Sequence, residues 1–232
     1  MTAGLRLPRD FYTRDAVTVA RALLGARLTV AGRGHTRRSG LIVETEAYCG
    51  PEDRACHAFG GRRTARTEPM FAIGGTAYVY LVYGLHHQFN VVTSGVGDPQ
   101  AVLVRAVAPV EGLAGMRRRR AGRADRELSN GPGKLCCALG IDRRLDGADL
   151  LGDRVWIEAP DCPIAPSRIA RGTRVGIEYA QAWAQRPWRF WISGNPYVSR
   201  PTPGSRSSSG LNAAEGAGRP GRLARAVTTA IS

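Results

Sequence analysis

The chain has 232 residues, 43% of them hydrophobic and 22% charged, which is enough for one folded domain with a buried core. Its 33 lysine and arginine residues outnumber the 19 aspartate and glutamate residues, giving a formal net charge of +14 at pH 7. The sequence contains no run of 18 apolar residues, which excludes a transmembrane helix. The N-terminus has no apolar segment of the kind found in signal peptides, so none is predicted.

The excess of positive charge favours a polyanionic partner, because neutralising phosphates releases counterions and gives affinity that does not depend on sequence. A ribosomal or membrane-surface protein would also be basic. Genome composition can favour arginine, and Lys134 is the only lysine in the chain. Genome composition does not, however, explain the excess of basic over acidic residues.

The cysteines indicate a reducing compartment. The chain has five cysteines, an odd number, and their spacing is not that of a disulfide framework. They are Cys49, Cys56, Cys136, Cys137 and Cys162. We therefore expect free thiols in a cytoplasmic protein.

The first part of the chain predicts one helix and two strands, followed by an irregular segment. Residues 13–25 begin with Thr13-Arg14-Asp15, continue with helically spaced apolar residues and end at a glycine, which predicts a capped amphipathic helix. Residues 28–30 and 41–46 are expected to be strands. Residues 49–69 are rich in Gly, Pro, Arg and Thr, and such long irregular segments are usually functional or disordered.

The middle of the chain predicts a β-hairpin. In residues 76–93, two β-rich runs flank a short connection that contains Gly84. A strand is expected at residues 101–107, and a short helix at 109–120 that ends in four arginines.

The rest of the folded part predicts a helix and then strands. After a Gly-Pro-Gly loop, a helix is expected from Lys134 to residue 139, and strands at residues 156–158, 173–177 and 188–193. From about Pro201 the composition changes to Ser, Gly, Pro, Arg and Ala. We predict one folded domain, residues 1–200, and a disordered basic tail, residues 201–232.

Glu44, Glu46 and Tyr48 form the strongest candidate site. In a strand these three side chains share one face, at the point where an apolar run enters the irregular segment that contains His57. A carboxylate there could be a general base, a metal ligand or one member of a glycosidase pair. The alternative is an edge strand with a solvated polar face.

The predicted hairpin carries a second group of candidate residues. Tyr78 and Tyr80 share a face, and Tyr83 lies at the turn, where an aromatic ring is poorly placed for a core and well placed to enter a base stack. We count Tyr78 with Tyr83 among the residues expected to contact DNA, and cross-strand aromatic packing is the alternative for these tyrosines. Asn90 is polar within a β-branched run and therefore needs a hydrogen-bond partner or lines a pocket.

Basic residues supply candidates for phosphate contacts. Arg105 lies within an apolar strand and must face a partner or the surface. Lys134 follows a Gly-Pro-Gly turn at a helix start, an arrangement that can hold a phosphate. Arg62, Arg63, Arg66 and the run at residues 117–120 are further candidates, although the run could equally be a solvated helix end. No metal site is predicted, because the Cys and His pairs are adjacent in sequence and none has zinc-finger spacing.

Several separated motifs together resemble the alkyladenine (3-methyladenine) DNA glycosylase family, bacterial type. They are residues 44–57 (ETEAYCGPEDRACH), 75–84 (GTAYVYLVYG), Asn90, 104–106 (VRA) and 128–135 (LSNGPGKL), within a match from about Arg9 to about Ser199. The His86-His87 pair and the arginine-rich tail depart from the pattern. Neither departure touches the catalytic positions.

The resemblance implies a role for most of the candidate residues. Glu46 is implied to be the general base that deprotonates the attacking water, with Arg105 helping to hold that water. Tyr48, His57 and Tyr80 would line the pocket, with Tyr48 stacked on the flipped base. Asn90 would screen against guanine, and Tyr83 would intercalate through the minor groove.

The resemblance also implies the fold and the activity. The expected fold is mixed α/β (α+β), a single domain with a curved, largely antiparallel sheet, flanking helices and a protruding β-hairpin. No metal and no organic cofactor are expected. The expected activity is that of a monomeric, monofunctional base-excision repair glycosylase, nucleoid-associated when bound to double-stranded DNA, that flips out alkylated or deaminated purines and hydrolyses the N-glycosidic bond. No membrane partner is expected.

Two other functions compete with this interpretation. A non-catalytic protein that binds lesions or duplex DNA would keep the pocket without turnover, but the presence of Glu46 argues against it. An N-glycoside hydrolase acting on free nucleosides or RNA is the second alternative. For free nucleosides, Tyr83 and the net charge of +14 argue against it, because neither would serve a small substrate.

Overall fold

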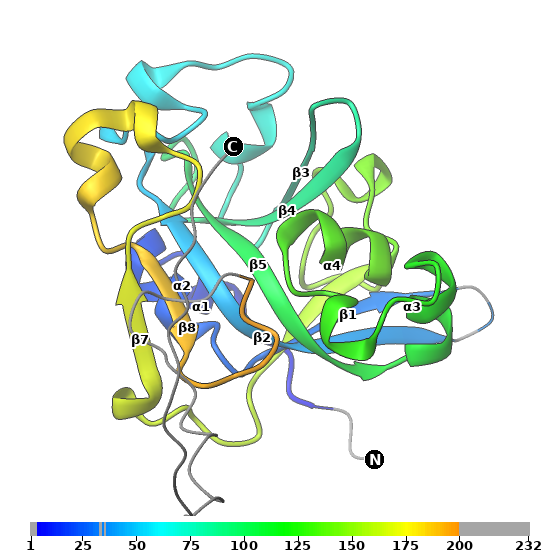
Figure 1. Cartoon of the computed structure of the whole chain (residues 1–232). Coiled ribbons are helices and arrows are strands. Elements are labelled where there is room, and N and C mark those ends of the chain that lie inside the picture. The colour runs from blue at the N-terminus through cyan, green and yellow to red at the C-terminus, as the bar shows by residue number, and fades with distance from the viewer. Residues whose placement is uncertain (1–3, 33, 35, 200–232) are drawn as a thin grey trace, which may run out of the picture. The chain divides into compact units, whose positions relative to one another are not determined.

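Two long antiparallel strands, β2 (Arg37–Tyr48) and β5 (Gln100–Glu111), form the centre of the fold (Figure 1). The computed structural model describes residues 4–32, 34 and 36–199. The main path of the sheet runs β3-β4-β5-β2-β1-β6, and β8 pairs with both β2 and β7. The other strands are β1 (Arg27–Ala31), β3 (Ala77–Val82), β4 (His86–Thr93), β6 (Val155–Glu158), β7 (Ile169–Gly172) and β8 (Arg189–Ile192).

Irregularities in the pairing of β2 with β5 curve the sheet. The register runs from Ile42 opposite Val107 to Glu44 opposite Ala106, and then to Thr45 opposite Val104, so that Val43 and Arg105 are left without a partner in this register. An unpaired residue in a ladder bends its strand and re-aims the neighbouring side chains. The sheet is therefore most distorted beside Glu44 and Arg105.

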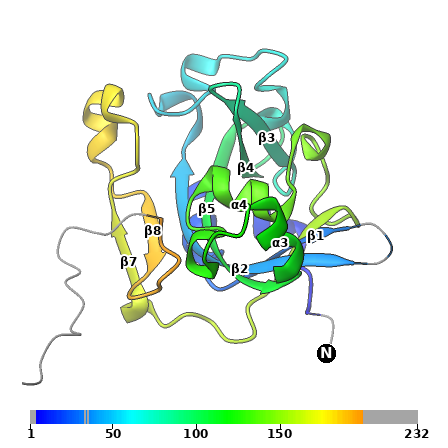
Figure 2. The ribbon, with the colours of Figure 1, turned by 45° about the vertical axis from the view of Figure 1, so that its right-hand side comes forward.

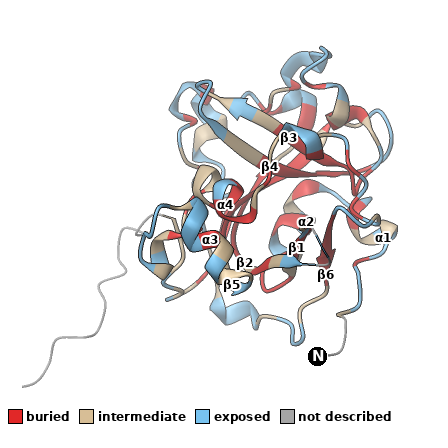
Figure 3. Ribbon diagram, turned by 90° about the vertical axis from the view of Figure 1, so that its right-hand side faces the viewer, coloured by how far each residue is buried: buried red, intermediate tan, exposed pale blue. Residues whose placement is uncertain are grey.

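Short helices pack against the two faces of the sheet. The α-helices are α1 (Arg9–Tyr12), α2 (Ala16–Ala22), α3 (Leu113–Arg119) and α4 (Pro132–Leu139). α2 contacts β2 and β5 on one side, whereas α4 contacts β4 and β5 and lies beside α3 in front of the sheet in Figure 2. Buried residues follow the strands in Figure 3, and they include the largest apolar cluster.

The predicted fold class, a mixed α/β domain with a curved antiparallel sheet, is confirmed. So are the hairpin, which is β3 and β4, and the helix capped by Asp15, which is α2. The irregular segment at residues 49–69 consists largely of loops and three short 3-10 turns, namely η1 (Gly50–Glu52), η2 (Phe59–Gly61) and η3 (Glu68–Phe71).

Several predicted bounds are wrong. Residues 109–111 continue β5, and α3 begins only at Leu113, after Gly112 with its left-handed φ of 80°. α4 begins at Pro132 rather than Lys134, because proline is well suited to the first turn of a helix. Residues 173–177 form no strand, and the strand of that region is β7, which ends at Gly172.

Two further expectations concern parts of the chain that bear less on the site. The predicted disordered tail, residues 201–232, lies outside the described residues. In the part of the chain that the structure describes, no helix combines the length and the apolar character needed to cross a bilayer.

The N-cap of α2 gives a first test of the local structure. The Asp15 side chain accepts a 2.9 Å hydrogen bond from the Thr18 backbone N–H. We expect Asp15→Ala to lower the free energy of unfolding by about 1 kcal/mol, measured by urea denaturation, because a donor at the helix end loses its acceptor. Asp15→Asn keeps an acceptor and should stay close to wild type. Equal losses in both variants would contradict a capping role.

Candidate active site

Glu44, Glu46 and Tyr48 lie on one face of β2, as the strand period predicts. Thr45, on the other face, donates a 2.8 Å hydrogen bond to the Ala20 carbonyl in α2. Glu44 and Glu46 are completely buried. β2 lies inside the sheet with neighbours on both sides, so the alternative of a solvated edge strand is wrong.

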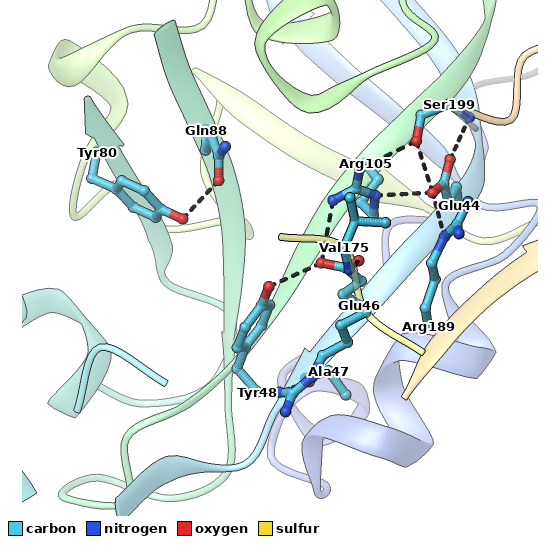
Figure 4. A network of polar contacts seen from close by, with 11 residues as sticks. Glu44, Glu46, Ala47, Tyr48, Tyr80, Gln88, Arg105, Val175, Arg189 and Ser199 are labelled. Carbon is cyan, nitrogen blue, oxygen red and sulfur yellow. Dashed lines mark hydrogen bonds and ion pairs between the residues drawn. The ribbon is translucent and has the colours of Figure 1, made fainter. Parts of the chain in front are cut away.

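Arg105 joins the two glutamates (Figure 4). Its Nε atom lies 2.9 Å from Glu44 Oε1, and its Nη1 atom lies 3.3 Å from Glu46 Oε2. Burial acts to lower the pKa of Arg105, but Glu46 and Glu44 outweigh burial and raise it. The guanidinium therefore stays charged between two carboxylates.

Glu44 has a supporting position in this network. Its Oε1 atom accepts hydrogen bonds from Arg105, from Arg189 Nε at 2.7 Å and from Ser199 Oγ at 2.9 Å. Its Oε2 atom accepts a 2.6 Å bond from the Ser199 backbone N–H. With both oxygens engaged and no exposure, Glu44 orients Arg105 and ties the last described residue to the sheet.

Glu46 lies on the side of the network that faces a cavity. Its Oε1 atom accepts a 2.7 Å hydrogen bond from the Val175 backbone N–H, and its Oε2 atom accepts a 2.9 Å bond from the Tyr48 hydroxyl. Burial, and then the negative charge of Glu46, raise the pKa of Tyr48 well above its ordinary value, so the hydroxyl keeps its proton and donates. Donors from three separate segments thus fix this carboxylate.

The cavity beside Glu46 has a volume of about 650 Å³. Many of the sequence-predicted residues line it together, among them Tyr48, His57, Tyr78, Tyr80, Asn90 and Arg105. Tyr83 also lines this cavity. Glu46 does not line it directly but contacts two of its lining residues, Tyr48 and Arg105. The volume is in the range of pockets that hold a small molecule or a single base.

An aromatic cluster forms one wall of the cavity. The rings of Tyr78 and Tyr80 are 5.1 Å apart, and His57 meets Tyr80 edge-on at 4.6 Å. The Tyr78 hydroxyl lies 2.9 Å from His57 Nδ1, and the Tyr80 hydroxyl donates a 2.7 Å hydrogen bond to Gln88. Burial raises the pKa of Tyr78 to about 12.

His57 is neutral at pH 7. Burial, and then the positive charges of Arg66 and Arg62, lower the pKa of His57 to about 4. Arg66 also lies 5.0 Å above the Tyr80 ring, at the edge of the cavity. The wall next to Tyr80 is thus uncharged, and the positive charge lies at the rim.

Tyr48 is supported from behind by a residue that the sequence did not indicate. The Arg174 guanidinium lies 4.8 Å from the centre of the Tyr48 ring. Its charge is compensated by an ion pair with Asp53, which includes a 2.8 Å Nη2–Oδ1 bond, and its Nη1 atom donates to the Ala47 carbonyl at 2.9 Å. Arg174 therefore fixes the end of β2 and the ring that it carries.

Asn90 and Tyr78 are more buried than residues at a surface interface usually are. Asn90 is 3% exposed and donates a 3.1 Å hydrogen bond to the Tyr78 carbonyl, across the β3–β4 pair. Tyr78, predicted among the DNA-contacting residues, is 2% exposed. Its place in the structure is the cavity wall next to His57.

Tyr83 stands out at the tip of the hairpin. It is 91% exposed and has a φ of 51°, and Gly84 beside it has a φ of 69°. The turn is closed by a 3.0 Å bond from the Leu85 N–H to the Val82 carbonyl, and Leu85 is itself 76% exposed. The hairpin therefore presents two large apolar side chains to solvent beside the cavity.

Lys134 lies outside the aromatic cavity. Its Nζ atom donates a 2.9 Å hydrogen bond to the side chain of Asn130, which precedes α4. It lines a separate cavity together with Leu85, His86 and Arg120. The predicted phosphate site at Lys134 is thus next to the hairpin. It could contact a phosphate only if a nucleic-acid strand passes beside the hairpin tip.

The other predicted arginines divide into two groups. Arg63 forms an ion pair with Glu68, and Arg117 with Asp125, both on the surface, where such pairs contribute little stability. Arg118 and Arg119 line a further cavity. Only part of the arginine run is therefore a paired helix end.

The sequence reasoning missed the residues that hold the network from the C-terminal third of the chain. Arg189 had the same signal as Arg105, an arginine inside an apolar strand, and that signal could have been used. The Val175 N–H could not have been found, because a backbone donor has no side-chain signature. Residues 173–177 are not a strand partly because their hydrogen bonds go to the site, and Gly176 has a φ of 74°.

The structure also bears on metal binding and on the thiols. Among the described residues, no group of three His, Cys, Asp or Glu side chains is placed to hold a metal ion. All five cysteines are free thiols.

Comparison with known proteins assigns the family. Residues 10–196 match the methylpurine-DNA glycosylase (MPG) family. The chain belongs to this family. It is 46% identical over 205 residues to proteins of Bacillus cytotoxicus and Bacillus anthracis, both named "Putative 3-methyladenine DNA glycosylase", and the matches cover 84% of this chain and 100% of those proteins. Members of this family are DNA repair glycosylases, so DNA is the substrate of this chain.

The low pKa of His57 predicts a pH-dependent stability. In the unfolded chain His57 takes up a proton near pH 6.5, whereas in the folded protein it does so only near pH 4. Between these values the unfolded state binds more protons, so stability falls as the pH falls from 6.5 towards 4. We expect His57 to account for at most about 3 kcal/mol of this loss.

The measurement is urea unfolding of wild type and His57→Gln between pH 7 and pH 4.5. The variant keeps a polar partner for Tyr78 but has no group that titrates there, so its stability should fall less steeply. Parallel curves for the two proteins would show that His57 titrates normally in the folded state.

Proposed function

We propose that this chain is a monofunctional glycosylase that flips a damaged purine out of double-stranded DNA and hydrolyses its N-glycosidic bond with a water activated by Glu46. The observation that carries the proposal is the position of Glu46. It is a buried carboxylate, held by three donors, and two of these donors, Tyr48 and Arg105, line a cavity with aromatic walls.

The chemistry needs little more than such a carboxylate. A purine alkylated at N3 or N7 carries a positive charge and is a good leaving group, and the sugar develops positive charge as the bond breaks. A fixed negative charge stabilises that transition state, and the same carboxylate can take a proton from the attacking water. Among the described residues, the one donor to Oε1 is the Val175 N–H, which leaves this oxygen a further lone pair as acceptor.

Arg105 has a positioning role in this proposal. Bonded to both glutamates, it fixes Glu46 Oε2 together with the Tyr48 hydroxyl and lines the cavity where the water would enter. It is charged and 6% exposed, so its location is fixed by its carboxylate partners rather than by solvent.

The cavity suits an electron-poor, cationic base. Tyr48 and Tyr80 offer ring faces, which attract cations and stack on bases. His57 is neutral at pH 7, and Asp53 compensates the charge of Arg174 behind Tyr48, so neither repels a cationic purine. We propose alkylated purines as the main substrates, 3-methyladenine among them, with deaminated purines bound by the same stacking.

Two further residues complete the proposal. Asn90, held by its bond to the Tyr78 carbonyl, would crowd the exocyclic 2-amino group of guanine. Tyr83, exposed at the hairpin tip, would enter the base stack and fill the space left by the flipped nucleotide.

The absence of lyase chemistry is also part of the proposal. Strand cleavage would need a nucleophilic amine beside the sugar, and the single lysine of the chain, Lys134, lines a different cavity. We further propose that the protein acts as a monomer in the cytoplasm, at the nucleoid, with damaged duplex DNA as its partner.

Substituting the proposed base is the decisive test. We expect Glu46→Gln to lower the single-turnover rate of base release by about a hundred- to ten-thousandfold, because the amide can neither take the proton nor carry the charge. Binding to the lesion duplex should persist. The measurement uses duplexes that each carry one lesion: 3-methyladenine, 7-methylguanine, hypoxanthine or ethenoadenine.

The matched control is Glu52→Gln, which removes an exposed carboxylate from the loop that follows β2. It should leave the rate unchanged. Normal turnover by Glu46→Gln would remove Glu46 as the base. Binding of lesion duplexes without base release by wild type would favour the non-catalytic lesion-binding function instead.

The hairpin tip is tested separately. We expect Tyr83→Ala to weaken lesion binding roughly ten- to hundredfold, because the ring no longer replaces the lost stacking. Tyr83→Phe keeps the ring and should bind nearly as well as wild type. A fluorescent base analogue beside the lesion reports flipping directly. Unchanged flipping by Tyr83→Ala would show that Tyr83 does not enter the stack.

A further inference from the structure

A second, larger cavity of about 880 Å³ shares no lining residue with the aromatic cavity. It lies between the ends of β1 and β2, α3, and the segment after α4. Six arginines line it, and they are Arg37, Arg38, Arg118, Arg119, Arg144 and Arg154. Among its described lining residues Asp142 is the one acid, and it is already bonded to Arg144 at 2.7 Å.

The positive charge of this arginine cavity is largely uncompensated. Arg118 and Arg119 are exposed at the end of α3, and no carboxylate of the described residues forms an ion pair with either. Arg38 donates to the Leu139 carbonyl at 2.6 Å, and its pKa is lowered by burial and then by Arg119. Like charges held this close repel one another, and an anion placed among them relieves the repulsion.

Three neighbouring cavities follow one another in a series, from the aromatic cavity through the cavity that contains Lys134 to the arginine cavity. The cavity of about 540 Å³ that contains Lys134 shares Pro132 with the aromatic cavity and is lined by Arg120, the neighbour of Arg119. The start of α4 lies against the hairpin, since a Cβ at Gly133 would be 3.1 Å from His86 Cβ. The Nε atom of Arg120 is buried with no hydrogen-bond partner among the described residues.

The spacing of the series matches a nucleic-acid strand. From Lys134 to Gly140 the chain runs along α4 for about 9 Å at the helical rise of 1.5 Å per residue. Phosphates of one strand of B-DNA follow one another at about 3.4 Å along the axis, so this stretch corresponds to roughly three base pairs. Since Gly133 lies against the hairpin, the arginine cavity is roughly three base pairs beyond that contact.

We propose that the arginine cavity binds backbone phosphates of the duplex on one side of the lesion, the side that passes from the hairpin over α4 towards α3. The inference rests on the proposed function, because Tyr83 and the aromatic cavity place the lesion. Contact with DNA on this protein is then asymmetric, with one flank held by Lys134 and Arg120 and, farther out, by Arg118 and Arg119.

The test uses Arg118→Ala/Arg119→Ala, because both side chains are exposed and neither belongs to the proposed catalytic machinery. Its control is Arg168→Ala/Arg171→Ala, which removes the same charge from exposed positions before and in β7, a strand on the left of Figure 2, away from α3. Binding is measured by fluorescence anisotropy over a range of salt concentrations. Four duplexes are compared, with about four or about fifteen base pairs on the 5′ side and on the 3′ side of one lesion.

We expect Arg118→Ala/Arg119→Ala to bind less tightly to the duplex with two long flanks. It should also bind less tightly to one of the two duplexes that have one long and one short flank. The slope of log K against log salt concentration should become shallower by about one to two, as expected for the loss of one or two phosphate contacts. Binding to the other asymmetric duplex and to the short duplex should match wild type, as should the single-turnover rate at saturating enzyme.

Equal losses on all four duplexes, no loss on any, or a loss no greater than that of the β7 control would each overturn the proposal. The proposal would also be overturned if Arg118→Ala/Arg119→Ala left the binding of one lesion duplex per protein unchanged and weakened only the binding of an additional DNA molecule. The cavity would then hold a separate DNA molecule and not the flank of the lesion duplex. The binding series can be read without turnover. A wild-type protein that bound but never released a base would refute the proposed function and leave this result readable.

Discussion

Arg105 and the two glutamates that it joins are the interaction on which the rest of the structure depends. Removing a charged group from water costs several kcal/mol, and the attraction of a partner repays this only when geometry and hydrogen bonding are good. Here two carboxylates and two guanidiniums, those of Glu44, Glu46, Arg105 and Arg189, are buried together and their formal charges cancel. Removing one member would leave an uncompensated charge inside the sheet, at a cost of about 3–5 kcal/mol.

The distortion of the sheet follows from this network. Arg105 lies at the irregularity between β2 and β5, and from this position its guanidinium reaches both glutamates. The same network draws in segments distant in sequence, through Arg189 in β8, the Val175 N–H and Ser199. Segments that begin more than 120 residues after Glu46 thereby close one side of the cavity.

The protein separates its charges by location. Around the aromatic cavity each buried cation has an acidic partner: Arg105 has Glu44 and Glu46, and Arg174 has Asp53, while His57 stays neutral at pH 7. The uncompensated cations lie instead at the rim and over α3 and α4. The uncompensated cations on the surface can attract a polyanion. Inside, each cation is paired with an acidic residue at short range, so the cavity can still accept a cationic base.

Much of the fold and of the site could be predicted from local pattern. The apolar run that ends in Glu44, Glu46 and Tyr48 fixes a strand and the face that the three share, and the runs around Gly84 fix a hairpin with Tyr83 at its tip. The strand at residues 173–177 was predicted wrongly, since Val175 and Ile177 have β propensity but the backbone there donates to Glu46. Propensity describes the fit of a residue to a pleated surface and does not reveal which acceptor its N–H will find.

By itself the sequence therefore determined which residues are candidates for the chemistry, which strand face they share, and the excess of positive charge. Those properties depend on side chains a few positions apart, and the period of a strand or the sequence of a turn is enough to derive them. Only the tertiary structure decided that Glu44 contacts Arg189 and Ser199 while Glu46 contacts Tyr48 and Val175, that Arg174 lies against the Tyr48 ring, and that Arg118 and Arg119 share a cavity with Arg38. These are contacts between segments far apart in the chain, and the packing of the whole sheet sets them.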